Sequence, residues 1–156
     1  MTWVSRVVCE HSAVLGRAPT VDAWRAHEPD DAACGPVTRT GEWQIGVHAD
    51  SDAARAQVIA LVQPMSAAGL PVGSAIARLT RADLPACSVL LSDGELAAGL
   101  AWGEPLGLGE IGAWEYALSA SPLPDHPWTP LTAGTIVVLD SCGPTVFRVP
   151  HSQETP

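Results

Sequence analysis

Lysine is absent from this sequence, and positive charge of any kind is scarce. The eight basic residues are all arginine, against 17 Asp and Glu, which gives a formal net charge of −9. Without lysine the chain cannot form a Schiff base, and it cannot hold a nucleotide phosphate through a P-loop lysine. An acidic surface repels phosphate backbones and anionic lipids, so we expect neither nucleic acid nor a membrane as a partner.

The sequence also shows no CxxC pair, no long apolar run and no recognisable signal-peptide pattern. The four cysteines are scattered and form no CxxC pair, which argues against a zinc ribbon and favours isolated buried thiols. The longest apolar stretches are far shorter than the roughly 20 residues that span a membrane. The first residues lack the charged and apolar segments of a signal peptide, and we therefore expect a cytoplasmic protein.

The apolar content is nevertheless that of a folded protein. The chain has 156 residues, of which 47% are apolar and 16% are charged, so it can bury a core and is not disordered throughout. No internal repeat or long linker divides it. We expect a single domain over residues 1–150, followed by a polar tail at residues 151–156.

Short β-branched runs and turn dipeptides predict about six strands. Asp93-Gly94 and Gly143-Pro144 predict the turns of two hairpins. The expected strands lie at residues 3–9, 43–48, 87–91, 95–99, 135–139 and 145–149.

Two or three helices are expected among these strands. Thr20 is a suitable N-cap for a helix over residues 21–27, and apolar spacing predicts an amphipathic helix from about residue 107 to 119. Residues 50–63 are ambiguous, because Ser51 could cap a helix but an apolar run inside this stretch could equally be a buried strand.

Two kinds of breaker residue follow this ambiguous stretch. Pro64 is expected to end either element, and Gly69, Pro71 and Gly73 predict a loop. The hairpins favour an α+β fold on a mostly antiparallel or mixed sheet over a doubly wound one.

A succession of short motifs runs along most of the chain. They are Val14-Leu15-Gly16-Arg17, Trp43-Gln44-Ile45, residues 83–91, Asp93-Gly94-Glu95, Gly99, Leu106-Gly107, Ala113-Trp114, Leu118, residues 130–139 and Gly143-Pro144. In this order they resemble the fumarylacetoacetate hydrolase superfamily, and within it the 2-hydroxypentadienoate hydratase and 4-oxalocrotonate decarboxylase branch. The resemblance implies a shortened, single-domain α+β fold with a mixed β-roll or barrel-like sheet, and a homodimer or larger assembly.

The family that the chain resembles uses Mg²⁺ or Mn²⁺, held by a Glu-x-Glu pair and a later Asp. Placed on this pattern, the second Glu is Glu10, but the first position is Val8 and the Asp falls near Val37. One carboxylate cannot hold such an ion against water. The resemblance thus implies a degraded metal site, and we expect no metal and no cofactor.

Three residues are candidates for catalysis. Glu10, in the former metal site, is a candidate general base whose pKa apolar neighbours would raise, the alternative being a solvated carboxylate at a strand end. His48 and Asp50 are two residues apart, so on a strand they share a face and form a candidate acid/base pair. The alternative for Asp50, Ser51 and Asp52 is a helix N-terminus, where they satisfy free amides.

Four further residues are candidates for substrate binding. Arg39 is a candidate to bind an anionic group of the substrate, and the flat apolar indole of Trp43 is a candidate to pack against it. Asp52 and Ser141 fall at positions that line the pocket in the resembled family, although Ser141 is also an ordinary turn residue before Gly143.

The function expected from the resemblance is a repurposed, metal-independent lyase or isomerase. It would dehydrate, tautomerise or cyclise a small oxo-acid, an enol or a polyketide-like biosynthetic intermediate, since enol chemistry needs only a base and a group that holds the oxyanion. The alternative is a non-catalytic partner subunit that binds and stabilises a related full-length hydratase or decarboxylase.

Overall fold

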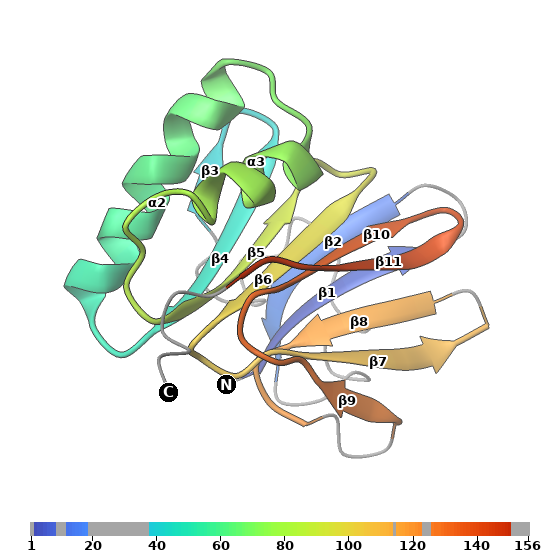
Figure 1. The fold of residues 1–156 in the computed structure, drawn as a ribbon. Helices are drawn as coiled ribbons and strands as arrows, with labels where there is room; N and C mark the ends of the chain where they lie inside the picture. Colours follow the sequence, from blue (N-terminus) through green and yellow to red (C-terminus); the bar gives the residue numbers. More distant parts are fainter. Residues whose placement is uncertain (1, 9–11, 19–37, 114, 123–125, 151–156) are drawn as a thin grey trace.

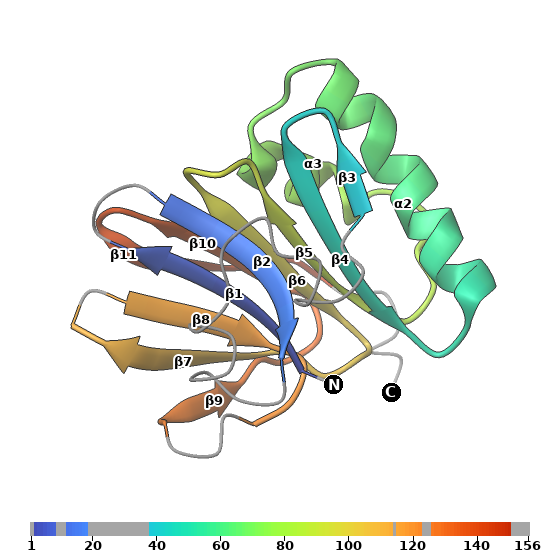
Figure 2. The same ribbon diagram turned by 180° about the vertical axis from the view of Figure 1, so that it is seen from behind.

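Two antiparallel sheets stacked face to face, with two helices on one outer side, form the part of the chain that the structure describes (Figures 1 and 2). The computed structural model describes residues 2–8, 12–18, 38–113, 115–122 and 126–150, and only the backbone of the first two ranges. The predicted helix at residues 21–27 and the predicted tail at residues 151–156 lie outside the described residues.

The first sheet has five strands in the order β2-β1-β8-β7-β9. Its strands are β1 (Thr2–Val8), β2 (Ser12–Ala18), β7 (Gly107–Gly112), β8 (Glu115–Ser119) and β9 (Trp128–Pro130). Every paired strand in it is antiparallel to its neighbour. The helix predicted over residues 107–119 is therefore wrong: Gly107, Gly109 and Gly112 weaken a helix, and the segment pairs as the β7–β8 hairpin instead.

The second sheet has six strands in the order β11-β10-β6-β5-β4-β3. Its strands are β3 (Thr38–Thr40), β4 (Trp43–Ala49), β5 (Cys87–Ser92), β6 (Ala97–Trp102), β10 (Thr135–Asp140) and β11 (Gly143–Arg148). The predicted β5–β6 and β10–β11 hairpins are confirmed. The α+β class is confirmed too, but within the described residues the sheets are open, with β3 and β11 at the edges of this one, so the barrel-like closure is not observed.

The helices α2 (Asp52–Ala67) and α3 (Val72–Leu79) cover the outer face of the six-stranded sheet (Figure 1). The ambiguous residues 50–63 thus form a helix and not a strand. Ser51 caps this helix, because its hydroxyl accepts a hydrogen bond from the Ala54 amide at 3.1 Å. The predicted break at Pro64 is wrong, because α2 continues to Ala67. Neither described helix has the length and the apolar run that a transmembrane helix requires.

Alternate residues of β5 and β6 face opposite sides of their sheet, and both sides are buried. The side toward the helices packs against the apolar residues Val58, Val62, Ile76 and Leu79 of α2 and α3. The side toward the five-stranded sheet packs Leu90, Ala97, Ala101 and Val137 against Leu118 of β8. Apolar side chains therefore fill the space between the two sheets near β6 and β10. A polar site between the sheets is expected nearer to β4 and β5.

Candidate functional site

Polar side chains replace apolar ones where β4 and β5 face the other sheet. Gln44 pairs with Ser92 across these strands, and His48 pairs with Ser88. Since Ser88, Leu90 and Ser92 alternate along β5, all of them share the side on which Leu90 packs between the sheets. The strand β2 contacts both β4 and β5, so these polar groups lie between the two layers.

One end of this polar strip carries a group that we call the His48 cluster: His48, Ser88 and Glu104. The imidazole Nε2 of His48 lies 3.5 Å from Oε2 of Glu104, and the two side chains are 44% and 23% exposed. Ser88 is only 3% exposed and is the cross-strand neighbour of His48. The cluster thus combines the imidazole of His48 and the carboxylate of Glu104, which are both partly exposed to solvent, with the nearly buried Ser88.

The backbone explains how Glu104 reaches His48. Gly103 forms a bridge with Cys87 at the beginning of β5, and the Glu104 amide donates a hydrogen bond to the Cys87 carbonyl at 3.4 Å. Gly103 has φ +99°, a conformation that residues with a side chain rarely adopt. The glycine turns the chain after β6 so that Glu104 lies over the ends of β4 and β5. In Figures 1 and 2 the beginning of β1 lies beside this same end of β6.

Of the two thiols whose side chains the structure describes, Cys87 lies at the His48 cluster and is poorly suited to act as a nucleophile. Burial, and to a smaller extent the Glu104 carboxylate, raise the pKa of Cys87 from 9.0 to about 11. At neutral pH the thiol is therefore protonated, and the reactive thiolate form is suppressed. Cys87 also points toward the helices, on the side of β5 opposite to Ser88.

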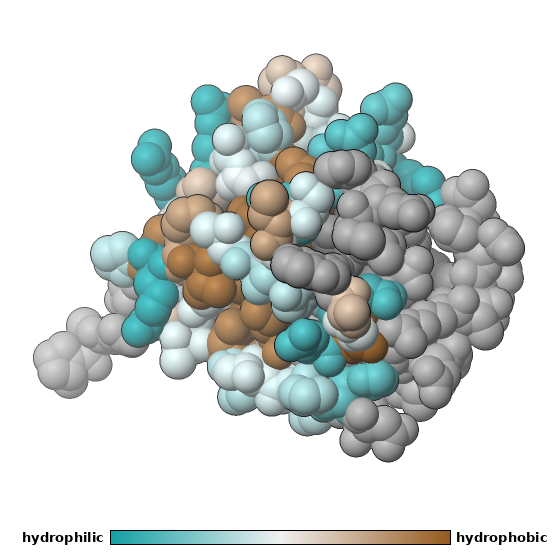
Figure 3. All heavy atoms as spheres, turned by 90° about the vertical axis from the view of Figure 1, so that its right-hand side faces the viewer, coloured by the Kyte–Doolittle hydropathy of each residue, from teal (hydrophilic) through white to brown (hydrophobic). Residues whose placement is uncertain are grey.

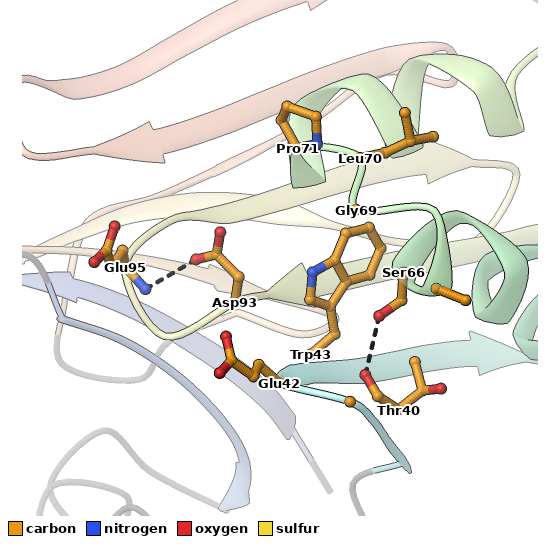
Figure 4. Close-up of a pocket in the computed structure, with 11 residues that line it drawn as sticks. Thr40, Glu42, Trp43, Ser66, Gly69, Leu70, Pro71, Asp93 and Glu95 are labelled. Atoms are coloured by element: carbon orange, nitrogen blue, oxygen red, sulfur yellow. Dashed lines mark hydrogen bonds between the residues drawn. The ribbon is translucent and has the colours of Figure 1, made fainter.

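A second polar site lies at the opposite end of β4 and β5 (Figure 4). The β3–β4 turn, the end of α2 and the β5–β6 turn border an open pocket of about 680 Å³. The indole of Trp43 forms its centre, and the carboxylates of Glu42, Asp93 and Glu95 line one side. Ser66, on the other side, donates a hydrogen bond to the Thr40 carbonyl at 3.0 Å.

The structure separates the residues that the sequence predicted for one site. His48 lies in the His48 cluster, whereas Trp43 lines the pocket at the other end of β4. Asp50 is exposed beyond the end of β4, so among the described residues Glu104 and not Asp50 is the carboxylate beside His48. Glu10 lies outside the described residues.

The remaining predicted residues lie apart from the His48 cluster. Arg39 is on the edge strand β3, opposite Gln44. Asp52 is in the first turn of α2 and forms an ion pair with Arg55 at 2.5 Å, which confirms the helix N-terminus. Ser141 is in the turn between β10 and β11, where the Asp140 carboxylate accepts a hydrogen bond from the Cys142 amide at 2.7 Å.

Sequence reasoning missed Ser88 and Glu104. Ser88 is a small polar residue inside an otherwise apolar predicted strand, a signal that the sequence did contain. Glu104 follows Gly103 directly after a strand, but only the pairing of β4 with β5 and β6 brings it to His48. Among the described residues there is no group of three or more Asp, Glu, His or Cys side chains that could hold a metal ion.

Comparisons with known proteins identify the fold. The sequence matches no family model and no curated protein. Its structure is similar to a glutamine aminotransferase class-II domain protein from Silicibacter pomeroyi, with a TM-score of 0.52 and 15% identity over 94% of this chain and 90% of that one. Glutamine phosphoribosylpyrophosphate amidotransferase from B. subtilis gives 0.48 and 13% identity over 94% of this chain, which spans only 42% of that protein.

The expected membership of the fumarylacetoacetate hydrolase superfamily is therefore wrong. The lyase or isomerase reaction, its oxo-acid or enol substrates and the proposed hydratase-binding partner role depended on that membership and are corrected with it. The motifs behind the resemblance are short apolar strands separated by glycine turns, and any antiparallel hairpin produces such a pattern. What the comparison establishes is the fold.

Proposed function

We propose that this chain cleaves the carbon–nitrogen bond of a small carboxamide, with the His48 cluster as its site. The observation that carries the proposal is that His48 lies 3.5 Å from Glu104 and is also the cross-strand neighbour of Ser88. A serine, a histidine and a carboxylate recur as the acyl-transfer triad on several unrelated folds.

Each residue has a defined role in the proposed reaction. His48 accepts the proton of the Ser88 hydroxyl as the serine oxygen attacks the amide carbonyl, and it then donates that proton to the departing ammonia. Water, activated by the same imidazole, hydrolyses the resulting ester and regenerates Ser88. Glu104 orients the imidazole and stabilises its positive charge, while the partial exposure of His48 gives the substrate access from solvent.

The structural neighbour supplies the choice of substrate. The name of the Silicibacter pomeroyi protein refers to glutamine, whose side chain ends in a carboxamide. L-glutamine is therefore the first compound to test, and other small carboxamides follow.

Ammonia release from L-glutamine by the purified full chain tests the proposal. We expect Ser88→Ala to abolish turnover and His48→Gln to reduce it by about 10²–10⁴-fold, the usual loss when an acid/base group is removed. His126→Gln, which changes a histidine outside the cluster, is the matched control and should retain activity. Mass spectrometry should also find Ser88 labelled by a serine-directed fluorophosphonate, and this labelling should require His48.

Two results would refute this function. One is the absence of ammonia release from glutamine and from every simple carboxamide by a folded chain. The other is turnover that persists unchanged in Ser88→Ala, because the serine oxygen would then not be the nucleophile.

The homodimer or larger assembly predicted from the sequence is a further part of this proposal. On the edge strand β11, Val146 and Phe147 are 52% and 51% exposed, and apolar surface of this kind favours association. Light scattering of the purified chain measures the mass of the assembly, and a monomer at every concentration would contradict the prediction.

A further inference from the structure

The described helices leave the β10–β11 edge of the six-stranded sheet partly uncovered. The helix α2 packs over β3 and β4, and α3 packs over β5, β6 and β10, whereas β11 follows β10 at the edge of the sheet (Figure 1). Ile136 and Val138 of β10 face the helices, and Phe147 of β11 is directly opposite Ile136, so it shares that face. The apolar face of the sheet therefore continues past α3 to the edge strand.

Small residues of α3 leave an open groove over this part of the sheet, which we call the β11 groove. Gly73, Ser74 and Ala77 line it from the helix, and Ile136, Val138 and Phe147 line it from the sheet. A Cβ added to Gly73 would lie 3.3 Å from Cγ2 of Val138, so the helix backbone approaches β10 closely here. The volume of the groove is about 580 Å³, within the usual size range of small-molecule sites.

The surface of the groove is mostly apolar. Phe147 is 51% exposed, which is unusual for a large apolar side chain in a strand. In Figure 3, brown apolar side chains gather toward the left of the view, at the level of β11 in Figure 1. Covering such a surface with an aliphatic chain removes apolar area from water and is therefore favourable.

The charge of the groove differs from that of the rest of the chain. Asp and Glu outnumber Arg by 17 to 8 in the sequence, yet Arg148 is the one charged side chain among the described residues that line the groove. A guanidinium beside an apolar surface is complementary to a carboxylate, which it can bind through two parallel hydrogen bonds. The groove thus fits a ligand with an apolar body and one anionic end.

We propose that the β11 groove binds an aliphatic carboxylate, such as a medium-chain fatty acid. The aliphatic chain packs between α3 and the apolar side chains of β10 and β11, and the carboxylate pairs with Arg148. The groove is on the helix side of the six-stranded sheet, whereas the His48 cluster is on the side that faces the other sheet. This site therefore does not depend on the proposed amide cleavage.

Calorimetric titration of the full chain with four probes separates the apolar and the charged contributions. Octanoate has both features, 1-octanol lacks the charge, octylamine reverses it, and acetate lacks the aliphatic chain. The net charge of −9 attracts the amine and repels the anions, so a preference for octanoate requires a local positive group. We expect octanoate to bind about fivefold more tightly than 1-octanol and octylamine, and acetate to show no binding.

Substitutions assign the binding to the groove. Arg148→Gln should weaken octanoate binding by about fivefold and leave 1-octanol binding unchanged, whereas Arg81→Gln removes the same charge outside the groove and should change neither. Ala77→Phe fills the groove and should weaken octanoate binding by about tenfold or more. Ala60→Phe is the matched control, because Ala60 is also exposed on a helix but lies on α2.

Four outcomes would overturn the proposal. Octanoate could fail to bind a folded chain, or octylamine could bind as tightly as octanoate, so that Arg148 plays no part. Equal octanoate affinities of Ala77→Phe and Ala60→Phe would place the ligand elsewhere. Light scattering could also find a dimer that Ala77→Phe dissociates and Ala60→Phe does not, in which case a second copy of the chain occupies the groove.

Discussion

His48 and Glu104 lie side by side because the inner strands β4 and β6 run in the same direction and terminate at the same end of the six-stranded sheet. His48 is the penultimate residue of β4, and Glu104 follows β6, with Nε2 and Oε2 3.5 Å apart. The strand β5 lies between β4 and β6, and its first residue, Cys87, holds the Glu104 amide. The relative position of these two side chains therefore depends on the turn at Gly103.

Gly103→Ala should disrupt the His48 cluster through the backbone. The glycine has φ +99°, and a Cβ placed on it would lie 3.1 Å from the Cβ of Ala86. We expect a loss of about 1 kcal/mol or more in the free energy of unfolding, measured by urea denaturation, because both the strain and the contact oppose the native turn. Amide turnover should fall as well, since Glu104 moves away from His48.

Gly94→Ala is the matched control for this prediction. Gly94 also has a positive φ, +96°, but no atom lies within 4 Å of the Cβ that would be added. The strain should lower the free energy of unfolding of Gly94→Ala by a similar amount. Turnover should stay at the wild-type level, because Gly94 lies in the β5–β6 turn at the far end of the sheet. Equal losses of turnover in both variants would show that Gly103 does not position Glu104.

Local chemistry predicted the turns and the shortest-range pairings. The Asp93 side chain accepts hydrogen bonds from two following amides, and Gly94 supplies the positive φ, so this hairpin was fixed by adjacent residues. The helix after Ser51 was also encoded locally, in its cap. The position of Glu104 beside His48 was not, because it depends on the pairing of β5 with both β4 and β6. The helices α2 and α3 separate β4 from β5 in the chain, and no local sequence signal predicts that these two strands pair.

The wrong helix over residues 107–119 shows how tertiary pairing overrides periodicity. Leu108, Ile111 and Leu118 have helical spacing, but Leu108 pairs with Leu118 across the β7–β8 hairpin. The loop predicted from Gly69, Pro71 and Gly73 is confirmed at Gly69 and Pro71, but it ends earlier than expected, because α3 begins at Val72 and includes Gly73. Its buried face, Val72, Ala75, Ile76 and Leu79, has the three- and four-residue spacing of an amphipathic helix, which the breaker residues obscured.

Gly99→Ala should destabilise the packing between the two sheets. An added Cβ would lie 2.8 Å from Cδ1 of Leu118, and 3.2 Å from side-chain atoms of Leu90 and Leu106. We expect a loss of about 1–3 kcal/mol in the free energy of unfolding, the usual cost of overpacking a core. Chemical denaturation measures it, and the additional change Leu118→Val should recover part of the loss by opening space. A wild-type midpoint in Gly99→Ala would mean that the sheets are less closely packed here.

Ser51→Ala should remove the N-cap of α2. The serine hydroxyl accepts the hydrogen bond of the Ala54 amide at 3.1 Å, and alanine has no acceptor to replace it. The expected loss is about 1 kcal/mol in the free energy of unfolding. Ser51→Asp keeps an acceptor and adds a charge that the helix dipole favours, so it should unfold at or above the wild-type midpoint. Equal effects of alanine and aspartate would show that the cap contributes nothing to stability.

The buried thiol of Cys87 predicts how stability changes with pH. Its pKa is raised from 9.0 to about 11, so between these pH values an unfolded chain loses the thiol proton while the folded chain keeps it. The folded state then binds more protons than the unfolded state, and its stability must fall as the pH rises from 9 to 11. The total loss is about 2–3 kcal/mol, at about 1.4 kcal/mol per pH unit.

Urea denaturation at pH 8 and at several pH values up to 11 measures this decline in the free energy of unfolding. Because other groups titrate in both proteins, Cys87→Ala should also lose stability, but by about 2–3 kcal/mol less than the wild type. Glu104→Gln should lose part of the decline, because the carboxylate is the smaller of the two causes of the shift. Parallel pH profiles for the wild type and Cys87→Ala would mean that the thiol ionises as easily in the folded protein as in the unfolded chain.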